Sequence, residues 1–412
     1  MNMADGEMIE GMTGSVWDGM VVICSGTSWD GPKLSDRHLA ERLTNFAPVL
    51  WVDPPISLLT PLRRREFRSQ LRGPRLRRIG DRLVRLTPVV TPGMSRPGFR
   101  GLAMWATRRS MARAVAKLGG SVHAVVVGSL DDLFGACGEE IRLLWGTDDF
   151  AAAGELMGVS PMWLANREAA QLRSADTVCA VSRELATKWT STRHEPVSVI
   201  PNGCDTTLFA GCDAAPRPTD VYLDGPIAVF IGHLSERIDL RYLEAVADAG
   251  TSLLLVGPRQ STFDLERVTA LLARPNVQWV GPKPFLELGS YLRVANVGLT
   301  PYTESAFNRS SFPLKTLEYL AAGRPVVSTD LPSTRDLDTD LITIVPDPES
   351  FAIAVADLAG RPCDAGFVAR ARAFAAAHDW NARVEDIADL LKISRPVKHP
   401  LQAETIRRGS HP

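Results

Sequence analysis

Cysteine is scarce in this chain, and the few cysteines form no recognisable set. The 412 residues include six, none in a Cys-x-x-Cys motif and none placed with histidine at metal-ligand spacing. This argues against a zinc module and against a small disulfide framework. We therefore expect free thiols, a reducing compartment and no metal ion. The six are Cys24, Cys137, Cys179, Cys204, Cys212 and Cys363.

Long apolar runs are also missing. No stretch approaches the ~20 residues that a membrane-spanning helix needs. Residues 1–19 are polar and acidic and lack the basic start and apolar core of a signal peptide. Residues 394–412 are polar and interrupted by prolines. We expect both ends to be disordered and the protein to be cytoplasmic.

Acidic residues are nearly absent from one region of an otherwise balanced chain. The net charge is −1, yet between Pro61 and Gly120 the only acids are Glu66 and Asp81. Arginines interleave with apolar residues in the region Arg63–Arg85, as in segments that lie on an anionic membrane surface. A solvated basic face and a nucleic-acid patch are the alternatives, and no nucleic-acid-binding motif accompanies it. We expect peripheral contact with the inner face of the cell membrane and no nucleic-acid partner.

Short apolar runs alternate with helical periodicity along the whole chain, which predicts a parallel, doubly wound α/β fold. The length exceeds the roughly 250–300 residues at which one core stops growing, so we expect two domains. The predicted strands of the first half are 20–24, 49–52, 122–127, 141–145, 178–181 and 197–200. Those of the second half are 227–231, 252–256, 277–280, 297–299, 326–327 and 342–345.

The domain boundaries follow from composition. Residues 210–220 are small and proline-rich, as expected of a linker, between a first domain at 20–209 and a second at 221–378. We expect residues 379–392 to form a helix that returns to the first domain. Two Rossmann-like domains then face a central cleft, and ligands of such sheets bind beyond the carboxyl ends of the strands.

The stretch 311–327 carries the most specific chemistry. Pro313 suits the first turn of a helix, Gly323 suits its end, and the next apolar run predicts a strand. The free N–H groups of the helix start can hold phosphate, and Lys315 can add charge there. Glu318, one turn further along, can accept two hydrogen bonds from ribose hydroxyls. The alternative is that Lys315 and Glu318 form an ordinary solvated helix pair.

Two motifs resemble the GT-B glycosyltransferases related to family 4. They are the stretch from Pro313 to Val327, and Val199 to Asp205 with its following Phe209. Landmarks at 175–182, 232–234 and 257–258 follow the same order. Trp29-Asp30-Gly31, residues 37–40 and residues 52–55 are similar to the teichuronic-acid-type branch of cell-surface polysaccharide transferases.

The resemblance assigns Glu318 to the second glutamate of the family's E-x7-E motif, which holds the nucleotide ribose. The first glutamate is replaced by Ser310. Its sugar-contacting role then passes to the backbone N–H groups of Ser310, Ser311 and Phe312 or to the side chains of Asn308 and Arg309.

The family's basic pair falls on His233 and Ile238, so the phosphate contacts must differ here as well. We expect Arg237 and Lys315 to contact the diphosphate, with Arg309 as a third candidate, because the leaving group gains negative charge. No Asp-x-Asp motif follows a predicted strand, so no metal is expected to supply that charge.

Two acids follow a predicted strand of the first domain, at Asp148 and Asp149. Either could orient or deprotonate an acceptor hydroxyl, and the alternative is that one of them caps the next helix. Gly26 follows the first strand without a Gly-x-Gly-x-x-Gly motif, and it could allow close approach of a phosphate or an acceptor.

Together these features predict a glycosyltransferase that moves a sugar from a nucleotide diphosphate to a hydroxyl of a glycan or lipid-linked acceptor in cell-envelope synthesis. Retention of anomeric configuration is implied by the resemblance. A sugar-nucleotide epimerase of the same fold and an inactive sugar-nucleotide-binding partner protein are the alternatives.

Overall fold

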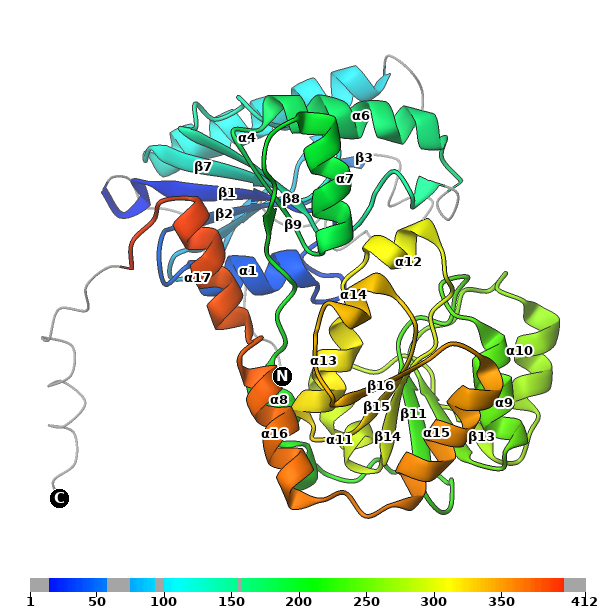
Figure 1. Cartoon of the computed structure of the whole chain (residues 1–412). Coiled ribbons are helices and arrows are strands. Elements are labelled where there is room, and N and C mark those ends of the chain that lie inside the picture. Colours follow the sequence, from blue (N-terminus) through cyan, green and yellow to red (C-terminus); the bar gives the residue numbers. More distant parts are fainter. Residues whose placement is uncertain (1–14, 58–74, 93–98, 155–157, 396–412) are drawn as a thin grey trace, which may run out of the picture.

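The protein folds into two α/β domains that lie against each other, as a computed structural model shows (Figure 1). The structure describes residues 15–57, 75–92, 99–154 and 158–395. An eight-stranded sheet forms the first domain and a six-stranded sheet the second. The predicted fold class, two doubly wound domains around a cleft, is confirmed. Residues 1–14 and 396–412, where most of the predicted disorder falls, lie outside the described residues.

The first sheet has the strand order β10-β9-β8-β7-β1-β2-β5-β4. Its neighbouring strands run parallel except β4 and β5, which pair antiparallel, so the prediction of a purely parallel sheet was wrong at this edge. A small parallel pair, β3 and β6, lies outside it. The bounds are β1 Met20–Cys24, β2 Val49–Val52, β3 Ile56–Ser57, β4 Leu76–Gly80, β5 Leu83–Leu86, β6 Val89–Val90, β7 Val122–Val127, β8 Ile141–Gly146, β9 Thr177–Ala180 and β10 Ser198–Val199.

Helices cover both faces of this sheet, because its central strands are apolar on both sides. On one face α4 (Phe99–Leu118), α6 (Pro161–Ser174) and α7 (Arg183–Arg193) share a core with alternate residues of the strands. On the other face α1 (Ser35–Leu43) packs with α17 (Trp380–Leu390). Trp51 and Trp145 are buried in this second core.

The second sheet is parallel throughout, in the order β13-β12-β11-β14-β15-β16. Its strands are β11 Ile227–Ile231, β12 Ser252–Val256, β13 Val277–Trp279, β14 Val297–Thr300, β15 Val326–Thr329 and β16 Ile342–Val345. Its helices are α9 Leu240–Asp248, α10 Leu265–Leu272, α11 Leu288–Arg293, α12 Ala306–Ser310, α13 Leu314–Ala321, α14 Pro332–Arg335, α15 Pro348–Gly360 and α16 Ala365–Ala376.

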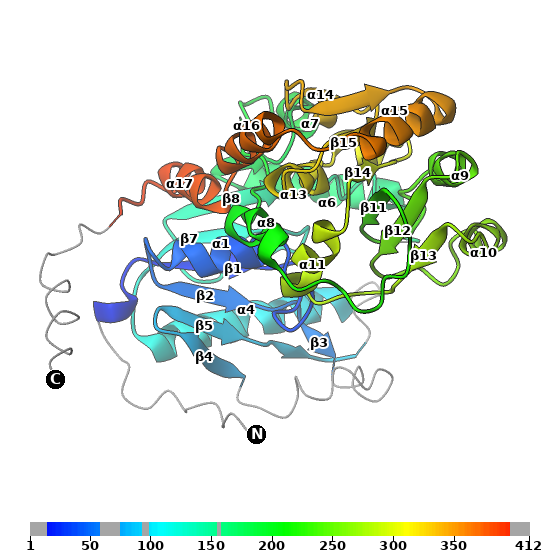
Figure 2. The same cartoon turned by 90° about the horizontal axis from the view of Figure 1, so that it is seen from below.

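The chain crosses between the domains twice. The first crossing runs through α8 (Thr206–Ala210) and the short helix Cys212–Ala214, and the second leads from α16 into α17. Figure 2 shows α16 and α17 bridging the two domains. Trp380 stacks on His38 of α1, with 5.1 Å between ring centroids. The last helix thus packs on the first domain.

The basic region Arg63–Arg85 is described only from residue 75 onward, and most of its arginines, at 63–72, lie outside the described residues. Arg85 itself is buried in β5, where its guanidinium pairs with Asp53 at 2.6 Å and Asp30 at 2.9 Å. Arg85 therefore cannot contact a membrane, and the predicted surface segment ends before it. In the part of the chain that the structure describes, no helix is long and apolar enough to cross a bilayer.

Candidate functional site

A cavity of about 330 Å³ lies between the carboxyl edges of the two sheets. Its first-domain side comes from the loops after β1, β7 and β8, and its second-domain side from the loops after β11 and β14 and from the start of α13. This is the edge at which parallel α/β sheets bind ligands. The lining includes Gly26, Thr27, Asp36, Gly128, Asp148, Asn202, Arg237, Tyr302, Ser311, Phe312 and Lys315.

The start of α13 supplies one cation to the cavity. The helix begins at Leu314, one residue later than predicted, and in its first turn the N–H groups of Leu314 and Thr316 donate to the carbonyls of Phe312 and Pro313. Lys315 Nζ lies 2.7 Å from Glu318 Oε2, and Glu318 is 4% exposed. The two residues therefore do form a pair at the cavity edge, in which Glu318 is buried and Lys315 is partly exposed. Glu318 lies one turn behind Lys315 and is not among the lining residues.

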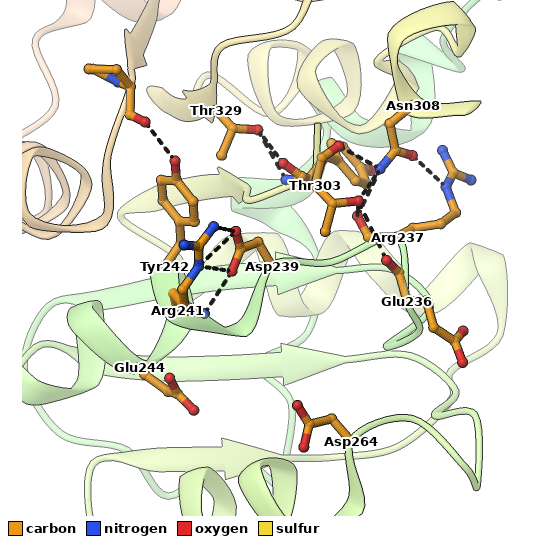
Figure 3. Close-up of polar contacts among 12 residues, drawn as sticks. Glu236, Arg237, Asp239, Arg241, Tyr242, Glu244, Asp264, Thr303, Asn308 and Thr329 are labelled. Atoms are coloured by element: carbon orange, nitrogen blue, oxygen red, sulfur yellow. Dashed lines mark hydrogen bonds and ion pairs between the residues drawn. The ribbon is translucent and has the colours of Figure 1, made fainter. Parts of the chain in front are cut away.

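Arg237 supplies the second cation, and Asn308 holds it in place (Figure 3). Arg237 Nε donates to Asn308 Oδ1 at 2.9 Å, while Asn308 Nδ2 donates back to the Arg237 carbonyl at 2.9 Å. Its guanidinium also lies over the Phe307 ring, 4.7 Å from the centroid. The two hydrogen bonds with Asn308 hold Arg237 in position. Asn308 is buried and its Nδ2 also donates to the Thr303 carbonyl, so its side chain is not free for the sugar contact considered from the sequence.

The adjacent acids of the first domain have different surroundings. Asp148 lines the cavity, where burial raises its pKa to about 6 although Arg237 and a hydrogen bond from Ser311 oppose that shift. Asp149 points away, accepting hydrogen bonds from Lys188 Nζ at 2.7 Å and from the backbone N–H of Ala152 at 2.9 Å. Asp149 thus caps the turn at residues 150–153 rather than the start of a helix, and Asp148 is the acid that reaches the cavity.

Ser310 and Ser311 form hydrogen bonds between the two domains next to this cavity. Ser311 Oγ lies 3.3 Å from Asp148 Oδ1, and Ser310 Oγ lies 3.3 Å from Asp149 Oδ2. The Ser182 hydroxyl donates to the Ser310 carbonyl at 2.6 Å. Position 310 therefore serves an interdomain contact, and its side chain does not line the cavity.

Arg309 is not brought to the cavity. Its guanidinium pairs with Glu304 at 3.1 Å and with Glu184 at 3.5 Å. It lines a separate hollow on the second domain, beside Arg335. Of the basic pair expected from the family pattern, Ile238 is buried and His233 is exposed outside the cavity lining.

Sequence reasoning missed two polar residues of the first-domain wall. Asn202 is 8% exposed, and its Oδ1 has no hydrogen-bond partner among the described residues. Asp36, on α1, accepts hydrogen bonds from Ser25 and Thr27, and burial raises its pKa. Asn202 lies within the motif at 199–205 that supported the resemblance, so a signal existed, but it marked the family rather than a contact.

Residues 225–361 match the family Glycosyl transferases group 1, a range that contains Arg237, Lys315 and Glu318. The second domain is therefore similar to a glycosyl transferase group 1 domain over these residues, and we refer to it below as the group 1 domain. This group 1 domain confirms the resemblance drawn from the stretch 313–327. Within the described residues, no three side chains of ligand type cluster as a metal site would require.

A relative extends the match beyond the group 1 domain. The chain is 30% identical over 226 residues to TuaH of Bacillus subtilis (strain 168), which bears the name of a teichuronic acid biosynthesis glycosyltransferase. The alignment covers 52% of this chain and 56% of TuaH, so the chain spans about half the length of this relative.

Solved structures place the group 1 domain within a two-domain fold. Sucrose-phosphate synthase from Thermosynechococcus elongatus matches with a TM-score of 0.68 and 18% identity, covering 90% of this chain and 98% of its own. Anabaena Alr3699/HepE, in complex with UDP and glucose, matches with a TM-score of 0.61 and 15% identity over 91% and 99% of the two chains. The fold of the whole chain is therefore GT-B.

Proposed function

We propose that this protein is a glycosyltransferase that moves a sugar from a nucleotide diphosphate to a hydroxyl of a glycan or glycolipid acceptor in cell-envelope synthesis. One observation carries the proposal: Arg237 and Lys315 of the group 1 domain line one cavity with Asp148 of the first domain. Cations on one wall suit a diphosphate, and a carboxylate on the opposite wall suits an acceptor hydroxyl. The name of TuaH and the UDP-bound HepE structure support the same reaction class.

The donor is proposed to bind against the start of α13. Its diphosphate contacts Arg237, Lys315 and the backbone N–H of Phe312, while Gly26 leaves room on the opposite wall; the backbone N–H of Ser311 instead donates to the Phe307 carbonyl at 3.0 Å. When Lys315 turns to the phosphate, the carboxylate of Glu318 becomes free to accept the ribose hydroxyls. These side chains supply the positive charge that the leaving nucleoside diphosphate needs, so the proposal assigns no step to a metal ion.

The acceptor is proposed to enter along the first domain. Asp148 orients or deprotonates its hydroxyl, whose oxygen bonds to the sugar carbon as the bond to the diphosphate breaks. We propose retention of anomeric configuration on the basis of the family resemblance, and NMR of the product tests it. A peripheral position at the inner face of the cell membrane completes the proposal, since the acceptor is expected to be lipid-linked.

Nucleotide affinity tests the donor site. Isothermal calorimetry should show that Glu318→Ala weakens binding of the matching nucleotide diphosphate about 10–100-fold, because two hydrogen bonds to a carboxylate are lost. A thermal-shift panel of nucleotide sugars first identifies that nucleotide. Glu304→Ala is the matched control, since Glu304 is an exposed acid outside the cavity. Equal affinity for wild type and Glu318→Ala would reject the ribose assignment.

Turnover assays separate the proposed transferase from the other functions considered. A transferase releases nucleoside diphosphate when the sugar is transferred to an acceptor or hydrolysed. An epimerase changes the configuration of the sugar without net release of nucleoside diphosphate. Binding without either reaction would identify an inactive partner protein, which the serine at position 310 makes worth testing.

A further inference from the structure

Large apolar side chains are exposed at the starts of two helices of the first domain. They are Phe99 (49% exposed), Leu102 (46%) and Trp105 (58%) of α4, and Met162 (73%) and Trp163 (40%) of α6. Grouped apolar exposure of this kind marks a contact surface rather than ordinary solvent-facing residues. We call these five residues the aromatic surface.

The two helix starts form one continuous surface. The Arg100 guanidinium of α4 and the Arg167 guanidinium of α6 each lie 5.0 Å from the centroid of the Trp163 ring. Figure 1 shows both helices on the same side of the eight-stranded sheet, where they share one core.

This surface lies at the cavity edge of the first domain. Both helices begin at the carboxyl edge of the sheet, because α4 leads into β7 and α6 leads into β9, and each must return the chain to the amino end of a parallel strand. The loop after β7, which begins at Gly128 on the cavity wall, holds them there. Arg100 pairs with Asp131 in this loop, and Arg167 Nε donates to the Leu130 carbonyl at 2.9 Å.

The charge around the aromatic surface is mainly positive, and the nearby acids Asp131 and Asp132 are paired with Arg100 and Arg108. Helix α4 carries five basic residues and no acid in its 20 residues. The acid of α6, Glu168, is 3% exposed and pairs with Lys188 at 3.0 Å. Arg109 and Arg113 are exposed on α4 and have no acidic partner among the described residues. Exposed tryptophan beside unpaired arginine fits the interface of an anionic bilayer.

We propose that the aromatic surface inserts into the headgroup region of an anionic lipid bilayer and so holds the acceptor side of the cavity against the membrane. This deepens the proposed function, on which it rests for its purpose. A second copy of the chain fits less well, because a two-fold contact through this surface would bring Arg109 and Arg113 of both copies together, while the acids nearby are already paired with Arg100 and Arg108.

The surface differs from the basic region predicted from the sequence in its position and in its chemistry. It depends on apolar insertion, so part of the binding should survive high salt, whereas arginine contacts alone are screened. Its residues also stand clear of the nucleotide wall, so changing them should leave donor binding intact.

Vesicle sedimentation tests the proposal with the full chain. Wild type should bind vesicles that contain phosphatidylglycerol, and the double variant Trp105→Gln with Met162→Gln should lower the partition coefficient by about tenfold or more. The matched control is Tyr222→Gln with Ile353→Gln, two equally exposed residues of the second domain, which should bind like wild type. A second variant, Arg109→Glu with Arg113→Glu, should lose binding chiefly at low salt.

Three results would overturn the proposal. Unchanged vesicle binding of Trp105→Gln with Met162→Gln, here called the aromatic variant, would do so, including the case in which vesicle binding depends only on the arginines at 63–68. So would equal binding to pure phosphatidylcholine and to anionic vesicles, or a dimer in light scattering that the aromatic variant dissociates. Nucleotide-induced thermal stabilisation is measured on the same variants. Absence of nucleotide-induced stabilisation in the wild-type protein would reject the proposed function, while vesicle binding would still test this inference separately.

Discussion

Asp148 should destabilise the folded protein at neutral pH, and removing its charge should reveal this. The carboxyl lies in the cavity wall, and burial raises its pKa from the usual 3.8 to about 6. Arg237 and Ser311 favour the ionised form, but not enough to offset the loss of water. Asp148→Asn keeps the shape and the hydrogen-bonding capacity of the side chain while removing the charge, so it isolates this cost.

The pKa shift sets the size and the sign of the effect. A shift of one unit corresponds to about 1.36 kcal/mol, so the full shift amounts to roughly 3 kcal/mol. Partial exposure of the side chain reduces this, and we expect about 1–3 kcal/mol. Because the folded pKa is the higher one, protonation favours the fold. That contribution is fully present below pH 3.8 and is lost as the pH rises through about 6.

Urea unfolding at several pH values measures the effect, with tryptophan fluorescence as the signal because most of the nine tryptophans lie in the first domain. At pH 8 Asp148→Asn should be the more stable protein, and its advantage should shrink as the pH falls to about 4. Asp149→Asn is the matched control and should destabilise the protein at pH 8, because it weakens the ion pair with Lys188 and the hydrogen bond to the turn at residues 150–153. A stability difference for Asp148→Asn that is independent of pH would refute the reasoning.

Two further predictions concern the cavity walls. Asn308→Ala should weaken binding of a nucleoside diphosphate about tenfold in calorimetry and leave binding of the bare nucleoside unchanged, because Asn308 acts only by positioning Arg237; equal losses for both ligands would indicate general unfolding. The free energy of unfolding of Asn202→Leu should lie within about 1 kcal/mol of the wild-type value, because the substitution removes a buried oxygen that has no hydrogen-bond partner among the described residues. The same variant should show a raised KM for the acceptor, and an unchanged KM would mean that Asn202 binds only solvent.

The strands were predictable wherever the core dictated the residues. The strands β1, β2, β7, β11 and β12 have the predicted bounds, because each is a short run of apolar residues buried on both faces. Burial of this kind leaves a signal that needs no knowledge of the partner strand. The same reasoning located α13, whose apolar face packs into a core of the second domain.

The hairpin of β4 and β5 could not be found in this way. Its arginines read as a basic surface segment, yet Arg85 is buried because Asp53, far away in sequence, neutralises it. A long-range ion pair leaves no local pattern. The same limit applies to Asn308, whose role depends on how the loop after β11 meets α12.

The serine at position 310 shows why the site could be only partly read from the family pattern. The pattern has a carboxylate there, on the second domain. In this protein Ser310 lies 3.3 Å from Asp149, and the neighbouring Ser311 lies 3.3 Å from Asp148. A glutamate at 310 would face two acids of the first domain, and like charges at such distances repel strongly in a buried site. The serine at position 310 therefore avoids repulsion with Asp148 and Asp149. In this arrangement the first domain, through Asp148, supplies the acid that the family pattern places on the second domain.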